Sequence, residues 1–114
     1  MSLLDQNMER LSLKDWSFCH LFFCCINLID ASNLKLPATT LADYCYLGMF
    51  NSCTSLVSAP ELPATTLAED CYGGMFRDCT SLVTAPELPA TTLADECYFA
   101  MFSGCRSLVN AQFP

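Results

Sequence analysis

The chain has few positive charges. Its 114 residues include 5 Lys and Arg against 12 Asp and Glu, which gives a formal net charge of −7 at pH 7. Nucleic acids and anionic membranes attract clustered cations, so this balance argues against both as partners. A glycine-rich phosphate loop is also missing, because the only paired glycines, Gly73 and Gly74, fall in repeat columns that otherwise hold unrelated residues. We interpret this glycine pair as variation on a helix surface.

No apolar run is long enough to cross a membrane. The best candidate, residues 16–29, follows Arg10 and Lys14 and could pass for the core of a signal peptide. It contains His20 and Asn27, however, and is shorter than the roughly 20 residues that a bilayer requires. We interpret it as part of the protein core and expect no signal peptide in this sequence and no membrane insertion.

What the sequence does contain is a repeat of 26 residues. The string Leu-Pro-Ala-Thr-Thr-Leu-Ala begins at Leu36, Leu62 and Leu88, and a shift of 28 residues aligns the N-terminal segment as a degenerate first unit. A fixed period of this length is typical of solenoids, whose units bury their apolar faces only against their neighbours. We predict a single solenoid domain over 1–114, with a degenerate N-terminal repeat or cap at 1–35 and regular repeats at 36–61, 62–87 and 88–114, the last one truncated.

Each repeat carries a helix signal and then a strand signal. Thr40 precedes Asp43 by three residues, as in a capping box, and the next two repeats contain equivalent pairs. Leu41, Cys45 and Met49 then recur at helical spacing. The Leu-Val pair that follows favours a short strand, and the prolines beyond it favour an extended connection. We therefore predict an α/β repeat solenoid, leucine-rich-repeat-like and right-handed, with short parallel strands plus one helix per 26-residue repeat.

The pattern Met-Phe-x-x-Cys-x-Ser-Leu occurs three times, beginning at Met49, Met75 and Met101. It resembles the signature of the BspA-like leucine-rich repeats of bacterial surface proteins, and the resemblance covers 36–109 with a weaker match back to about residue 11. The resemblance implies a strand and a helix in each repeat. It also implies a recognition or adhesion module at the cell surface or outside the cell, with host proteins bound by some members.

Nine cysteines are many for a chain of this length. Six occupy two apolar columns of the repeat, namely Cys45, Cys71 and Cys97 in one column and Cys53, Cys79 and Cys105 in the other. We interpret them as two ladders of free thiols that line the core, because a free cysteine packs like a small hydrophobe. Disulfides remain an alternative, mainly for the second ladder, while Cys19, Cys24 and Cys25 stay unassigned. No C-x-x-C pair supports a zinc site, so we expect no metal and no other cofactor.

Two constellations could suggest an enzyme, but each has a simpler structural interpretation. A cysteine nucleophile would need His20 as its base, and we place His20 on a partly exposed helix surface. The pairs Glu69-Asp70 and Asp95-Glu96 occupy the predicted first helical turn, where carboxylates stabilise the helix dipole. Adjacent helical side chains also point in different directions. We therefore expect no catalytic site.

The repeats differ from one another at only a few columns, which predicts solvent-facing positions where binding can occur. We predict one binding edge beside the strands, formed by Thr54, Thr80 and Arg106 together with Ser58, Thr84 and Asn110. Leu47 and Phe99 are apolar residues of another variable column and are candidate anchors. The sequence thus favours a non-enzymatic interaction or adhesion module for a host or neighbouring-cell protein or glycan. The alternative is a structural spacer or a self-associating repeat fragment, with end-to-end contacts between copies.

Overall fold

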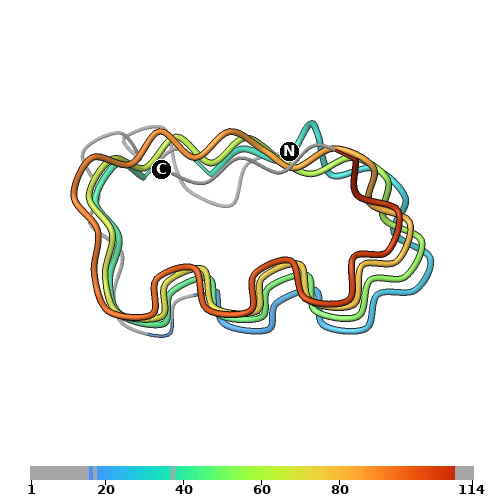
Figure 1. Ribbon diagram of the computed structural model, residues 1–114, viewed down its shortest axis with the longest axis horizontal. Coiled ribbons are helices and arrows are strands. Elements are labelled where there is room, and N and C mark those ends of the chain that lie inside the picture. Colours follow the sequence, from blue (N-terminus) through green and yellow to red (C-terminus); the bar gives the residue numbers. More distant parts are fainter. Residues whose placement is uncertain (1–15, 17, 37, 110–114) are drawn as a thin grey trace.

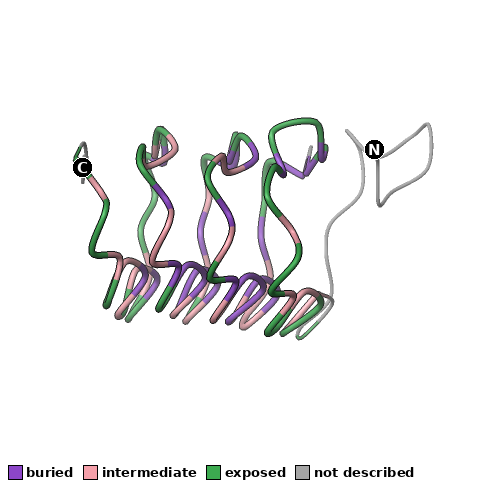
Figure 2. Ribbon diagram, turned by 90° about the vertical axis from the view of Figure 1, so that its right-hand side faces the viewer, coloured by how far each residue is buried: buried purple, intermediate pink, exposed green. Residues whose placement is uncertain are grey.

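The protein folds as a stack of four similar coils. The computed structural model describes residues 16, 18–36 and 38–109, and the structural statements below concern these residues. Viewed along the stack, the coils superpose as a flattened ring whose lower edge steps up and down at regular intervals (Figure 1). Viewed from the side, the coils stand in a row (Figure 2). The four coils comprise residues 16–39, 40–65, 66–91 and 92–109.

Neither helices nor extended strands form in the described part of the chain. Its β pairing consists of isolated parallel bridges, such as those that join Asp30 to Ser58 and Thr66 to Thr92. The predicted α/β solenoid with one helix and one strand per repeat is therefore wrong. The rule that predicted a right-handed crossover has no strand-helix-strand unit here to which it could apply.

The stepped lower edge of each coil, which we call the turn segment, is a chain of four-residue turns. Turn segments span residues 43–52, 69–78 and 95–104, and the first coil forms one at residues 16 and 18–24. Every second N–H donates to the C=O three residues earlier, as Met49 does to Tyr46 (3.1 Å). The N–H groups in between donate to the next coil, as Phe50 does to Met75 (2.9 Å). The interior coils thereby satisfy these backbone groups without a helix or a sheet.

This alternation places every fourth residue of a turn segment in the left-handed region. In the second coil these residues are Tyr44, Gly48 and Ser52, with φ of 60°, 58° and 65°. An L-residue in this conformation costs about 1–2 kcal/mol, and only glycine adopts it freely. Nine of the twelve such positions in the four coils are not glycine. Contacts between coils must therefore offset a substantial local strain.

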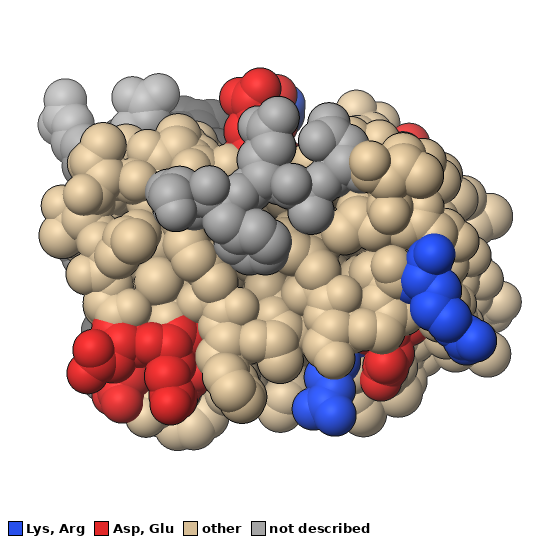
Figure 3. All heavy atoms as spheres, in the orientation of Figure 1, with Lys and Arg blue, Asp and Glu red and all other residues tan. Residues whose placement is uncertain are grey.

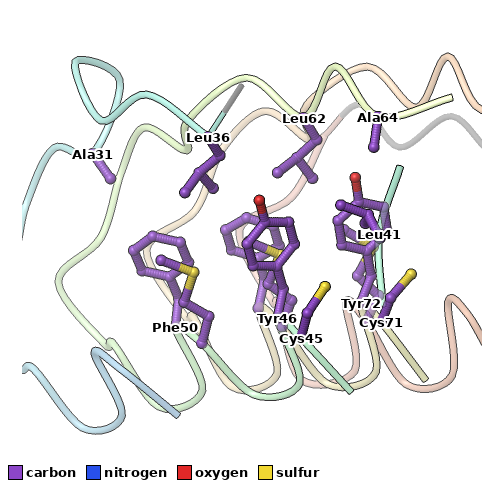
Figure 4. Close-up of a cluster of buried hydrophobic side chains, with 14 of the residues drawn as sticks. Ala31, Leu36, Leu41, Cys45, Tyr46, Phe50, Leu62, Ala64, Cys71 and Tyr72 are labelled. Atoms are coloured by element: carbon purple, nitrogen blue, oxygen red, sulfur yellow. The ribbon is translucent and has the colours of Figure 1, made fainter. Parts of the chain in front are cut away.

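Identical side chains stack from coil to coil and form the core. One aromatic ladder runs through Phe22, Phe50, Phe76 and Phe102, with ring centroids 5.3–5.8 Å apart and the rings nearly parallel. A second runs through Phe18, Tyr46, Tyr72 and Tyr98 at 5.9–6.1 Å. Figure 4 shows Tyr46 and Tyr72 with their hydroxyls directed toward the opposite wall, which carries Leu36 and Leu62. Burial raises the pKa of both tyrosines, so their hydroxyls stay neutral.

The residues that suggested a helix cap connect coils instead. Thr40 and Thr66 form a bridge with each other, at the position where each was expected to begin a helix. The Asp43 carboxylate contacts the next coil, where its Oδ1 accepts the N–H of Glu69 (3.0 Å). In this protein, the residues Thr40 and Asp43, which have the spacing of a capping box, therefore form contacts between neighbouring coils.

The two cysteine ladders line the interior as predicted, but on turns instead of helices. Five of their six thiols are buried, Cys105 is half-buried, and all nine cysteines are free. In the second ladder each thiol donates to a phenylalanine C=O of the preceding coil, for example Cys79 to Phe50 (3.1 Å). Burial raises the pKa of Cys45, Cys71 and Cys79 to about 12. These thiols are therefore neutral packing groups.

Candidate interaction surface

The predicted binding edge lies on one side of the stack, along the segments that follow the turn segments. We call them the side segments, and they comprise residues 25–30, 53–58, 79–84 and 105–109 at the right of Figure 1. Thr54, Arg106 and Thr84 are exposed, whereas Thr80 and Ser58 are half-buried. The structure therefore brings these five predicted residues to one face. Asn110 lies outside the described residues.

Hydroxyl groups fix the backbone of this face. The Ser81 hydroxyl donates to the Thr54 C=O of the preceding coil (2.7 Å), and the Ser107 hydroxyl donates to the Thr80 C=O at the same distance. The Thr80 hydroxyl makes a longer bond to the Thr54 C=O (3.4 Å). These bonds span neighbouring coils and hold the side segments in register, so the face is pre-organised.

Sequence reasoning missed the main feature of this face, which is an exposed apolar stripe. The stripe contains one β-branched residue per coil, namely Ile29, Val57, Val83 and Val109, all of them exposed. Backbone bonds align its members, since Val57 donates to the C=O of Ile29 (2.7 Å) and Val109 to that of Val83 (3.0 Å). Each leucine before a valine points inward, and Leu56 and Leu82 are fully buried. The Ser-Leu-Val triplet could have indicated this stripe in the sequence, because a leucine that points inward is followed by a valine that points outward.

A groove adjoins this stripe where the chain leaves the side segments. It has a volume of about 540 Å³ and lies between the Ala-Pro-Glu-Leu-Pro segments of the second and third coils. Pro60, Pro63, Pro86 and Pro89 contribute to its walls, together with the carboxylates of Glu61 and Glu87. The groove thus combines rigid apolar walls with negative charge.

The two predicted apolar anchors lie elsewhere. Leu47 and Phe99 belong to turn segments and not to the side segments. Leu47 is half-buried and packs over Gly73 of the next coil, where a Cβ would lie only 2.9 Å from its Cδ1. Gly73 is buried in a turn segment, so its interpretation as helix surface variation is wrong. Phe99 is 64% exposed in the last coil. The predicted residues therefore do not form one continuous surface.

Acidic side chains gather where the turn segments begin. Asp43, Glu69, Asp70, Asp95 and Glu96 occupy two adjacent columns there. Figure 3 shows acidic side chains at the lower left of this face of the molecule and cations at its bottom and right. The negative charge of Glu69 raises the pKa of Tyr44 across the interface between the second and third coils. In the described residues, no group of three or more His, Cys, Asp and Glu side chains could hold a metal ion.

The single histidine has a cysteine beside it, but the pair does not resemble an activated nucleophile. Nδ1 of His20 lies 3.6 Å from Sγ of Cys19. Burial raises the pKa of Cys19 above its ordinary value of 9.0, whereas a nucleophilic cysteine has a lowered pKa. His20 lies exposed in a turn with φ of 56°, and not on a helix as predicted.

These features define a repeat protein of stacked coils whose backbone is built from turns. No family model, curated protein or solved structure matches the chain. In the described residues, no helix is long and apolar enough to cross a membrane.

Proposed function

We propose that the protein is a non-enzymatic interaction module that binds a protein or glycan ligand along its side segments. The observation that carries this proposal is the stripe of Ile29, Val57, Val83 and Val109, which is exposed along one side of the stack. An apolar centre with a polar rim is the usual composition of a protein interface. Here the hydroxyls of Thr54 and Thr84 flank the stripe and form such a rim.

The stack also suits recognition physically. Its side face is held by bonds between coils, so little conformational entropy is lost when a ligand binds. The net charge of −7 and the carboxylates of Glu61 and Glu87 beside the stripe favour a neutral or basic ligand. Each coil contributes one exposed apolar residue to the stripe, so a long ligand can contact several coils at once.

The Met-Phe-x-x-Cys-x-Ser-Leu pattern and its resemblance to surface-protein repeats favour adhesion at a cell surface as the setting of this binding. A purely structural spacer is the alternative, and it requires no exposed apolar stripe. The stripe therefore favours recognition, because large exposed apolar patches usually mark interaction sites.

The proposal is tested by the binding of fluorescently labelled protein to cultured epithelial cell layers. We expect binding that saturates and that falls at least tenfold in the double variant Val57→Asp/Val83→Asp. Val57→Thr/Val83→Thr keeps the side-chain shape and should reduce binding less. Thr65→Asp, at an exposed position away from the side segments, is the control and should bind normally, and circular dichroism should show that every variant keeps the wild-type fold.

Treatment of the cells identifies the class of ligand. Loss of binding after trypsin indicates a protein ligand, and loss after glycosidases indicates a glycan. Wild-type protein that binds no cells, or folded stripe variants that bind as well as wild type, would contradict the proposal.

A further inference from the structure

The backbone hydrogen bonds between turn segments all run in one direction. At each of the three interfaces, five N–H groups of the earlier turn segment donate to five C=O groups of the later turn segment, at 2.7–3.1 Å. Gly48 donates to Gly73 and Ser52 to Arg77 in this way (both 2.8 Å). A row of turn segments joined by one-directional bonds must present donors at one end and acceptors at the other.

The outer face of the last coil presents backbone N–H donors. Glu96, Ala100 and Gly104 occupy the positions of Asp70, Gly74 and Asp78, each of which donates to the next coil at 2.7–3.1 Å. Within the described residues, the N–H groups of Glu96, Ala100 and Gly104 have no acceptor. This end therefore presents a row of donors in the geometry that the three internal interfaces use.

The outer face of the first coil presents backbone C=O acceptors. Cys19, Leu21 and Phe23 occupy the positions of Leu47, Met49 and Asn51, whose C=O groups each accept an N–H from the preceding coil. In the part of the chain that the structure describes, the C=O groups of Cys19, Leu21 and Phe23 accept no hydrogen bond. The two ends are therefore complementary in both chemistry and spacing.

Apolar side chains that interior coils bury are open at both ends. Leu93 is 50% exposed, whereas Leu67 in the same column is 5% exposed. At the other end Leu21 is 46% exposed, whereas its counterpart Met75 is fully buried. Phe99 and Phe23 add further exposed apolar area at their respective ends. Among the described residues, neither face has the neighbour that buries the equivalent residues elsewhere in the stack.

We propose that the first coil of a second copy of this chain docks on the last coil, in the register that the coils use internally. Ala100 then donates to Cys19 of the second copy, and Gly104 donates to its Phe23. The interface between copies thus repeats the contacts of each internal interface. The described residues 16 and 18–29 carry no Asp, Glu, Lys or Arg, so they add no repulsion to the acidic columns of the last coil. The contact is head-to-tail, so association continues as an open chain unless it closes into a ring.

Blocking one end at a time tests this proposal. Leu93→Glu/Phe99→Glu places charge on the donor end, and Leu21→Glu/Phe23→Glu places it on the acceptor end. We expect sedimentation velocity to show oligomers of wild type that grow with concentration, and monomers for each blocked variant. An equimolar mixture of the two variants should form a dimer and nothing larger, because it contains one intact donor end and one intact acceptor end.

Two controls keep the result specific. The side-face variant Val57→Glu/Val83→Glu has the same added charge and should still form long oligomers. In concentrated wild type, amide hydrogen exchange should slow at Ala100 and Gly104 relative to dilute protein, a result that needs no variant to fold. Wild type that stays monomeric, a blocked variant that still oligomerises, or side-face variants that dissociate would each overturn the proposal. The monomeric end variants should still bind cells, so this proposal can fail without the proposed function failing.

Discussion

The interior coils and the end coils share the same residue columns, yet the same column is buried in one and exposed in the other. Leu67 is 5% exposed and Leu93 is 50% exposed, although both follow the same Ala-Thr-Thr motif. The aromatic ladders show the same contrast, because Phe50 and Phe76 are fully buried whereas Phe22 is half-buried. A residue of this protein is buried by the neighbouring coil and not by its own.

This contrast locates the stability of the protein at the interfaces between coils. A single coil contains the strained left-handed residues but lacks the backbone bonds and ring stacks that offset them. Each added coil completes one interface, so stability is close to a sum over neighbours. The ends expose what an interface would bury, and the predictions below measure this difference.

Alkaline pH should have the largest effect, because it acts on several interior thiols at once. Burial raises the pKa of Cys71 from 9.0 to about 12 and that of Cys53 to about 11. A raised pKa means that the folded state keeps a proton that the unfolded state has lost. The stabilisation is therefore complete below pH 9 and is lost as pH rises from 9 toward 12, by about 1.4 kcal/mol per pH unit for each thiol.

Urea unfolding at neutral pH and at about pH 10 and 11 measures this loss. Cys71→Ala should make the decline with pH shallower, because one buried thiol is gone. Cys24→Ala removes an exposed thiol and should leave the decline unchanged. Equal stability of the wild type at neutral and alkaline pH would contradict the prediction.

Truncation of one leucine column should show the difference between interior and end directly. Leu67→Ala removes a buried side chain and should lower the free energy of unfolding by about 2–5 kcal/mol. Leu93→Ala should cost about half as much or less, because half of that side chain already contacts water. Chemical denaturation at low protein concentration measures both variants as monomers. Equal costs would show that the last coil is as well covered as the interior.

The sequence predicted the repeat and the inward columns correctly, but not the backbone that carries them. Cys45 and Cys53 are buried as expected, since stacking of identical units requires fixed apolar columns whatever the local conformation. The helix prediction failed because residues 41, 45 and 49 recur at intervals of four. A chain of four-residue turns repeats at 4.0 residues, and over two or three turns this is hard to distinguish from the 3.6 of a helix.

Prediction of the candidate site was partial for a related reason. Variable columns correctly identified Thr54 and Thr84 as lying on a surface, because solvent-facing residues are free to differ between repeats. The stripe at Val57 and Val83 was missed because it does not vary, and an invariant apolar residue suggests core. Leu47 was taken as an anchor because it varies, yet it is half-buried and packs over Gly73 of the next coil. Only the contacts between coils distinguish these cases.

The glycines of the left-handed column provide the smallest and most local test of the comparison. Gly74 has φ of 55°, and Ala100 adopts φ of 52° one coil later, so Gly74→Ala should cost only about 1–2 kcal/mol. Gly48 has the same conformation, but a Cβ there would overlap the His20 ring of the first coil. Gly48→Ala should therefore displace that ring from Phe23, its neighbour at 5.6 Å. We expect it to cost about 0.5 kcal/mol more than Gly74→Ala.

The background variant His20→Ala separates backbone strain from this overlap. In that background, Gly48→Ala should cost the same as Gly74→Ala, because only the strain of the left-handed residue remains. Urea denaturation of the four proteins in the cycle gives the coupling between positions 20 and 48. A coupling of zero would mean that His20 rotates away at no cost, so that the interface between the first two coils is held by the backbone ladder and the ring stacks alone. A measurable coupling would mean that the exposed surface of the first coil also contributes to holding it on the stack.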